Sequence, residues 1–191
     1  MSTRPVPVKI LPAFLLMLSF CAPSPPLSKE VSGRTFFTAA NIWYEIPEKI
    51  LSTNYHLGTI LPVGTKVEVD EVTSGEIRFR SEHGQDFKFI FIKKHSSAET
   101  EISDYFHMYF STENPLREGG PYQKFSDKEK KNIEKGTIEV GMSKEAVLMS
   151  YGYPPTHKTP SLEGDIWVYW TSRFANSAVH FVNGRVTRSN L

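Results

Sequence analysis

The fold is decided by the stretch 133–186, which reads IEKGTIEVGMSKEAVLMSYGYPPTHKTPSLEGDIWVYWTSRFANSAVHFVNGRV. Its local signals agree with one another. One helix ends at Gly136, a second is capped by Ser143 and stopped by Gly152, and Asn183-Gly184 is typical of a type I′ hairpin turn. The stretch carries no catalytic signature, so it indicates a structure before it indicates an activity.

Two short helices are predicted here. Ser126 and Glu129 have the spacing of a capping box, which opens the first helix. The second helix is expected over 144–151. Neither is long enough to be stable alone, so both must pack against another element.

That element is predicted to be a three-stranded antiparallel meander over 165–171, 178–182 and 185–187. Because side chains alternate across a strand, one face should meet the helices through Trp167, Tyr169, Val179, Phe181 and Val186. The opposite side holds Trp170, Arg173, Phe174 and His180. An outward tryptophan on a small sheet either marks a binding surface or contacts the preceding part of the chain, and the sequence leaves both open.

The segments VGMSKEAV, YGYPP, WVYW and VHFVNGRV resemble the motifs of the SmpA/OmlA (BamE-like) family. The resemblance covers residues 122–191. It implies an α+β domain in which a helix pair packs on a three-stranded antiparallel sheet. It also implies an outer-membrane lipoprotein that assists the β-barrel assembly machine. This chain departs from the family by carrying a further folded unit before the domain, and no partner-contacting residue can be matched by motif.

That further unit is predicted over 33–95. Runs of β-forming residues alternate with turn residues, as in 65–72 (TKVEVDEV), 76–81 (EIRFRS) and 87–92 (FKFIFI). Short strands at this spacing indicate a small antiparallel barrel. The fold class predicted for the whole chain is therefore mainly β plus α+β.

The segment 60–69 (ILPVGTKVEV) resembles the lead into the central strand of bacterial SH3-like domains. Such domains bind peptides or cell-wall material, although a fold alone does not establish binding. Trp43, Tyr44 and Tyr55 are the aromatic residues that could line a groove on this unit. The sequence leaves open whether Trp43 belongs to a ligand platform or to the core, and whether the barrel has any ligand.

Residues 96–121 are predicted to link the two units. A helix capped by Ser97 is expected over 97–110, with an apolar stripe formed by Ile102, Tyr105, Phe106 and Tyr109. We expect this stripe to dock on one of the flanking units. Asn114-Pro115 and Gly119-Gly120-Pro121 mark the loop that follows.

Residues 1–21 have the features of an export signal. Arg4 and Lys9 precede the apolar run 10–20, which is shorter than the roughly 20 residues that span a bilayer. Cys21, the only cysteine, ends the run, and the pattern predicts a lipoprotein signal in which Cys21 carries the lipid. Ordinary cleavage after Cys21 is the alternative, and it would leave a soluble periplasmic protein. The segment 22–32, rich in proline and serine, is predicted to be an extended tether.

Composition limits the functions open to the chain. Of its 191 residues, 39% are hydrophobic, which is enough for packed cores. Two of the 22 basic residues lie in the signal, so 20 basic residues face 21 acidic ones and nothing favours nucleic acid. None of the six histidines forms a ligand pair at close spacing, and no nucleophile or phosphate-loop motif occurs. We therefore expect no metal, no cofactor and no catalysis.

Two functions follow from these patterns. The first is a lipid-anchored protein on the periplasmic side of the outer membrane that binds envelope proteins, among them the β-barrel assembly machine. The second is a cell-wall or peptide-binding module that acts through the SH3-like unit and binds peptidoglycan.

Overall fold

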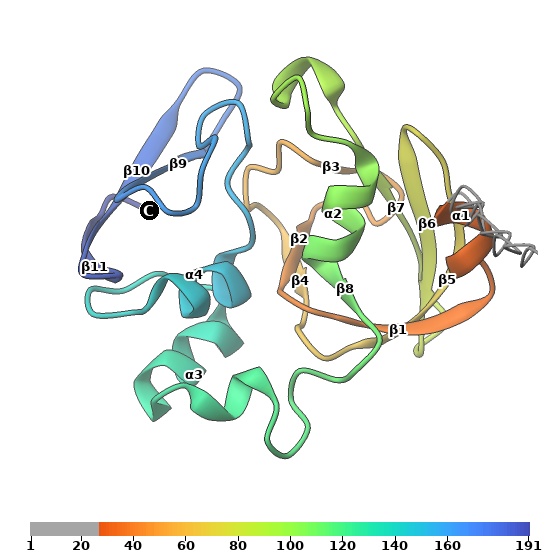
Figure 1. Ribbon diagram of the computed structural model, residues 1–191, viewed down its shortest axis with the longest axis horizontal. Coiled ribbons are helices and arrows are strands. Elements are labelled where there is room, and N and C mark those ends of the chain that lie inside the picture. The colour runs from red at the N-terminus through yellow and green to blue at the C-terminus, as the bar shows by residue number, and fades with distance from the viewer. Residues whose placement is uncertain (1–26) are drawn as a thin grey trace, which may run out of the picture.

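The structure, a computed structural model, describes residues 27–191. It is a mixed α+β fold with sheets of six, three and two strands and a few helices. Figure 1 shows two lobes, one built from the strands β1–β8 with helices α1 and α2, and the other from helices α3 and α4 with the strands β9–β11. The predicted signal and Cys21 lie outside the described residues.

The six-stranded sheet has the order β3-β7-β6-β5-β1-β8 and curls around one core. Its strands are β3 (Ile50–Leu51), β7 (Asp86–Ile90), β6 (Glu76–Ser81), β5 (Lys66–Val72), β1 (Arg34–Thr38) and β8 (Phe110–Ser111). Alternation places Val67, Val69, Ile77, Phe79 and Phe89 inside that core. The expectation of a wholly antiparallel barrel is wrong for β3, which pairs with β7 in parallel. A parallel pair needs a long connection, and here the connection contains β4 (Thr59–Leu61), β5 and β6.

Two further elements differ from their predicted positions. Helix α2 spans Ile102–Tyr109 and begins after Glu101, not at Ser97, because the side chains of Glu101 and Asp104 form its capping box. Its predicted stripe is buried against the core of the six-stranded sheet. Within the predicted tether, Leu27–Val31 forms helix α1 beside β5, because Val31 is buried in that same core; the extended prediction is wrong there.

The helix pair of the second lobe follows its predicted caps. In α3 (Asp127–Lys135), Ser126 and Glu129 form the capping box, and Gly136 ends the helix at φ 67°. In α4 (Lys144–Tyr151), the Ser143 hydroxyl accepts a hydrogen bond from the Ala146 N–H. Glu129 also accepts hydrogen bonds from the N–H and hydroxyl of Ser143, at 2.9 and 2.8 Å, so one carboxylate ties together the starts of both helices.

The three-stranded sheet is antiparallel, in the order β11-β10-β9. Its strands are β9 (Ile166–Trp170), β10 (Asn176–Val182) and β11 (Arg185–Ser189). The five residues predicted to face the helices are at most 3% exposed: Trp167, Tyr169, Val179, Phe181 and Val186. Asn183 and Gly184 have φ angles of 50° and 73°, as the type I′ turn requires.

The two lobes are joined by buried polar and apolar contacts. Asn41 is 2% exposed; its side-chain amide donates to the carbonyls of Ile133 (2.6 Å) and Ser150 (2.9 Å). The side-chain oxygen of Asn41 accepts a hydrogen bond from the Val63 N–H at 2.8 Å. The Val63 side chain belongs to the core of the second lobe although its backbone lies in the first. The junction is therefore buried, and atoms of both lobes pack against one another within it.

Candidate functional site

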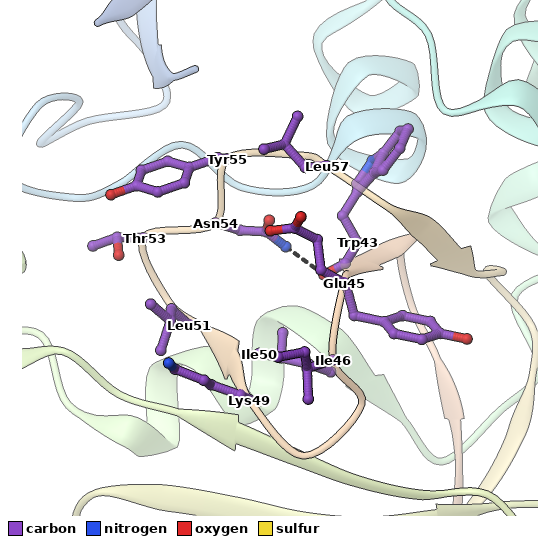
Figure 2. A pocket seen from close by; sticks show the side chains of 11 residues that line it. Trp43, Glu45, Ile46, Lys49, Ile50, Leu51, Thr53, Asn54, Tyr55 and Leu57 are labelled. Carbon is purple, nitrogen blue, oxygen red and sulfur yellow. Dashed lines mark hydrogen bonds between the residues drawn. The ribbon is translucent and has the colours of Figure 1, made fainter. Parts of the chain in front are cut away.

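A pocket of about 200 Å³ opens on the first lobe beside β2 (Ile42–Tyr44) and β3. Three of the predicted binding residues, Trp43, Tyr44 and Tyr55, line it (Figure 2). The other lining residues are Glu45, Ile46, Lys49, Ile50, Leu51, Thr53, Asn54 and Leu57. We call this the aromatic pocket.

The loop 52–58 forms one wall of the aromatic pocket, and polar contacts hold it in place. The Asn54 side-chain amide donates to the Trp43 carbonyl at 2.5 Å, the hydrogen bond drawn in Figure 2. The Asn54 side-chain oxygen accepts from the His56 N–H at 2.8 Å. The loop ends at Gly58, which has a φ of 85°. A glycine is needed at this position because a Cβ would lie 2.3 Å from the Tyr44 carbonyl oxygen. The loop then enters β4 (Thr59–Leu61), which pairs with β2.

His56 connects the loop 52–58 to the second lobe. It is 8% exposed, and its ring stacks on Tyr151 of α4 with centroids 3.9 Å apart. Burial lowers the pKa of His56 to about 3, with the carbonyls of Tyr151 and Trp170 opposing the shift, so the imidazole is neutral at pH 7. The pocket wall therefore rests on the second lobe through uncharged aromatic contacts.

The lining is mostly apolar, with a charged rim. Ile46 and Leu57 are 56% and 47% exposed, which is high for aliphatic side chains beside a pocket. Glu45 and Lys49 are exposed and contribute one charge of each sign. Such a lining can bury an apolar group of a ligand and pair with polar atoms beside it.

Trp43 lies between the aromatic pocket and the second lobe. It lines the aromatic pocket, and its ring also lies at the junction, 6.1 Å from Tyr151 and 6.4 Å from His56. Gly136 must be glycine there, since a Cβ would lie 2.6 Å from the Trp43 ring. Trp43 is thus held firmly by the second lobe.

The four outward residues predicted on the second lobe differ in their surroundings. Trp170 is half-buried against the first lobe, its ring parallel to Tyr55 at 6.2 Å. Of its two predicted roles, contact with the preceding unit is confirmed. Arg173 and Phe174 lie in the turn between β9 and β10, where Phe174 is 91% exposed and the guanidinium lies 5.4 Å from its ring. His180 is on β10 and hydrogen-bonds Arg188 at 2.8 Å.

Sequence reasoning missed Ile46, Lys49, Asn54 and Leu57 as lining residues. Ile46 lies directly before Pro47 and Leu57 directly before Gly58. An aliphatic residue beside a turn former is the only local sign of their exposure, and it is weak. Asn54 could not be identified, because it lies in a loop and its partner Trp43 lies in β2, 11 residues earlier in the chain.

Over residues 27–191, no three His, Cys, Asp or Glu side chains are grouped as a metal site would require. No helix in that range is long and apolar enough to cross a bilayer. Comparison of the chain with family models, curated proteins and solved structures found no match.

Proposed function

We propose that this chain is an exported, non-enzymatic protein of the cell envelope that binds a segment of a partner protein in the aromatic pocket. The observation that carries the proposal is the meeting of Trp43, Tyr44 and Tyr55 in one pocket whose rim exposes Ile46 and Leu57. Aromatic and aliphatic side chains held rigidly around a concave site are the usual anchors of protein recognition.

The rigidity of the lining supports binding. Tyr44 packs edge-on against Phe87 of the six-stranded sheet, with centroids 5.2 Å apart. Tyr55 is parallel to Trp170, and Trp43 is held at the junction. Side chains that are already ordered lose little entropy when a ligand binds, so more of the contact energy appears as affinity.

The partner class and the location rest on sequence patterns. We propose that Cys21 carries a lipid that holds the protein on the periplasmic face of the outer membrane. The partners would be envelope proteins, and the likeness of residues 122–191 to the SmpA/OmlA family makes outer-membrane assembly factors the first group to test. Labelling cells with palmitate should mark the wild-type chain and not Cys21→Ser; an unlabelled wild-type chain would refute the anchor.

Site-specific crosslinking tests the binding site. A photoreactive residue placed at Leu57 should crosslink an envelope protein in living cells. The same residue at Val182, 57% exposed on β10 of the second lobe, is the matched control and should crosslink nothing. Leu57→Lys and Ile46→Lys should abolish co-purification of the partner without lowering thermal stability, since both side chains are exposed.

A second candidate function places binding on the second lobe, and Phe174, 91% exposed beside Arg173, favours it. A crosslink from position 174 with none from position 57 would support that function and overturn the pocket proposal. Binding to the cell wall is a third possible outcome. If the purified chain is retained on peptidoglycan and Leu57→Lys is not, the ligand of the aromatic pocket is the cell wall and not a protein.

A further inference from the structure

The loop 52–58, one wall of the aromatic pocket, is held in place by its side chains. Within the described residues 27–191, no main-chain hydrogen bond joins residues 53–58 to another main-chain group. The last such bond before them runs from the Ser52 N–H to the Ile90 carbonyl, and strand pairing resumes at Thr59 in β4. Segments with few main-chain hydrogen bonds open locally at a lower free energy than the core of a protein does. This loop can therefore open once its side chains come away from their sites.

Two aromatic side chains attach the loop to the second lobe. The Tyr55 ring is parallel to Trp170, with centroids 6.2 Å apart. The His56 ring stacks on Tyr151 at 3.9 Å and meets the Tyr169 ring edge-on at 5.4 Å. His56 has a φ of 59°, which is uncommon for a residue other than glycine and persists only where the surroundings hold it. If the imidazole leaves its site, the loop loses its closest contact with the second lobe.

The site around the His56 ring offers no negative charge. Residues 52–58 contain no charged side chain, and none in the range 27–191 contributes to the pKa of His56. The titratable groups packed on the imidazole are Tyr151 of α4 and Tyr169 of β9. Burial raises the pKa of Tyr151 to about 12 and also raises that of Tyr169, so both hydroxyls stay neutral in mild acid. The carbonyls of Tyr151 and Trp170 favour the charged imidazole, but burial outweighs them.

We propose that the loop 52–58 is a proton-operated latch: in mild acid, His56 takes up a proton and leaves the second lobe, and one wall of the aromatic pocket is lost. The release of a bound partner rests on the proposed function of that pocket. The opening of the loop does not, because it depends only on the contacts of His56.

The size of the effect follows from the two states of the imidazole. In the closed loop, burial holds the pKa of His56 at about 3, whereas a ring released into water has the ordinary value of 6.5. The contribution of His56 to the closed state is therefore complete above pH 6.5 and is lost as the pH falls from 6.5 towards 3. Between pH 7 and pH 5, the ratio of open to closed molecules should rise about 25-fold.

Hydrogen exchange of the full chain, followed by nuclear magnetic resonance, tests the latch. The reporter is the His56 N–H, which donates to the Asn54 side-chain oxygen at 2.8 Å. After correction for the intrinsic exchange rate, its protection should be about 25-fold lower at pH 5 than at pH 7. The amide of Val69, in the core strand β5, should keep its protection. This comparison needs no variant.

Two variants assign the effect to one imidazole. His56→Phe keeps a ring in the site but cannot be protonated, so the amide of residue 56 should lose its pH response. His157→Gln is the matched control: His157 lies 5.6 Å from the Trp170 ring, and its removal should leave the response of His56 unchanged.

The latch is overturned if the protection of the His56 amide is the same at both pH values. It is also overturned if Val69 loses protection equally, because the whole chain then unfolds, or if His56→Phe retains the response. Crosslinking from Leu57 at the two pH values tests the consequence for a partner. A crosslink that is equally strong at pH 7 and pH 5 would overturn the regulation of the pocket. No crosslink at either pH, together with the exchange response, would refute the proposed function and support the latch.

Discussion

Asn41 should be one of the most sensitive positions in the chain, because its side chain makes three hydrogen bonds to main-chain groups at the junction. Asn41→Ala leaves the carbonyls of Ile133 and Ser150 and the N–H of Val63 without these partners. A buried hydrogen bond contributes about 1 kcal/mol net, and an orphaned polar group costs about 1–3 kcal/mol. At the lower end, three lost bonds give a decrease of about 3 kcal/mol in the free energy of unfolding.

Urea unfolding followed by tryptophan fluorescence measures this loss, since Trp43 and Trp170 both lie at the junction. The urea concentration at the midpoint should fall. The transition should remain single, because Val63 of the first lobe is part of the core of the second lobe. Asn176→Ala is the matched control; Asn176 is exposed on β10, and its loss should change stability by less than about 0.5 kcal/mol. A decrease below about 1 kcal/mol for Asn41→Ala would show that the three bonds do not stabilise the junction as argued.

Three further predictions concern the second lobe, the pocket wall and the exposed turn. Burial alone would raise the pKa of Glu129, but hydrogen bonds from the N–H groups and hydroxyls of Ser143 and Ser126 lower it to about 2, below the ordinary 4.5. The Glu129 carboxylate therefore adds up to about 3 kcal/mol to the free energy of unfolding above pH 4.5, and this is lost as the pH falls towards 2. In acid unfolding, Glu129→Gln should lack this part of the wild-type pH dependence. Gly58→Ala should lower the melting temperature more than Gly84→Ala, because both have positive φ but only Gly58 lacks space for a Cβ; equal effects would contradict the close approach to Tyr44. Phe174→Ser should leave the free energy of unfolding within about 0.5 kcal/mol of wild type, and a larger loss in calorimetry would mean that Phe174 packs against something.

Features specified by neighbouring residues were predicted correctly from the sequence. The capping box at Ser126, the helix stop at Gly136 and the turn at Asn183-Gly184 each depend on a few adjacent positions. The inward face of the meander follows from strand alternation, which is local as well. These features placed α3, α4 and β9–β11 within a few residues of their bounds.

Features that depend on distant partners could not be predicted. The parallel partner of β3 lies beyond three intervening strands. The start of α2 is different: it depends on neighbouring residues and was still predicted wrongly, because the capping box uses Glu101 and Asp104 and not Ser97. Trp43, Tyr44 and Tyr55 were identified as aromatic candidates, but only the folded loop 52–58 brings them to one pocket.

The six-stranded sheet ends on both sides in strands of two residues, β3 and β8. Unpaired strand edges are where chains most readily join into aggregates, and short edges offer few backbone groups to a stray strand. Edges this short leave the proposed partner to be bound by side chains in the aromatic pocket, and not by uncontrolled pairing with the sheet.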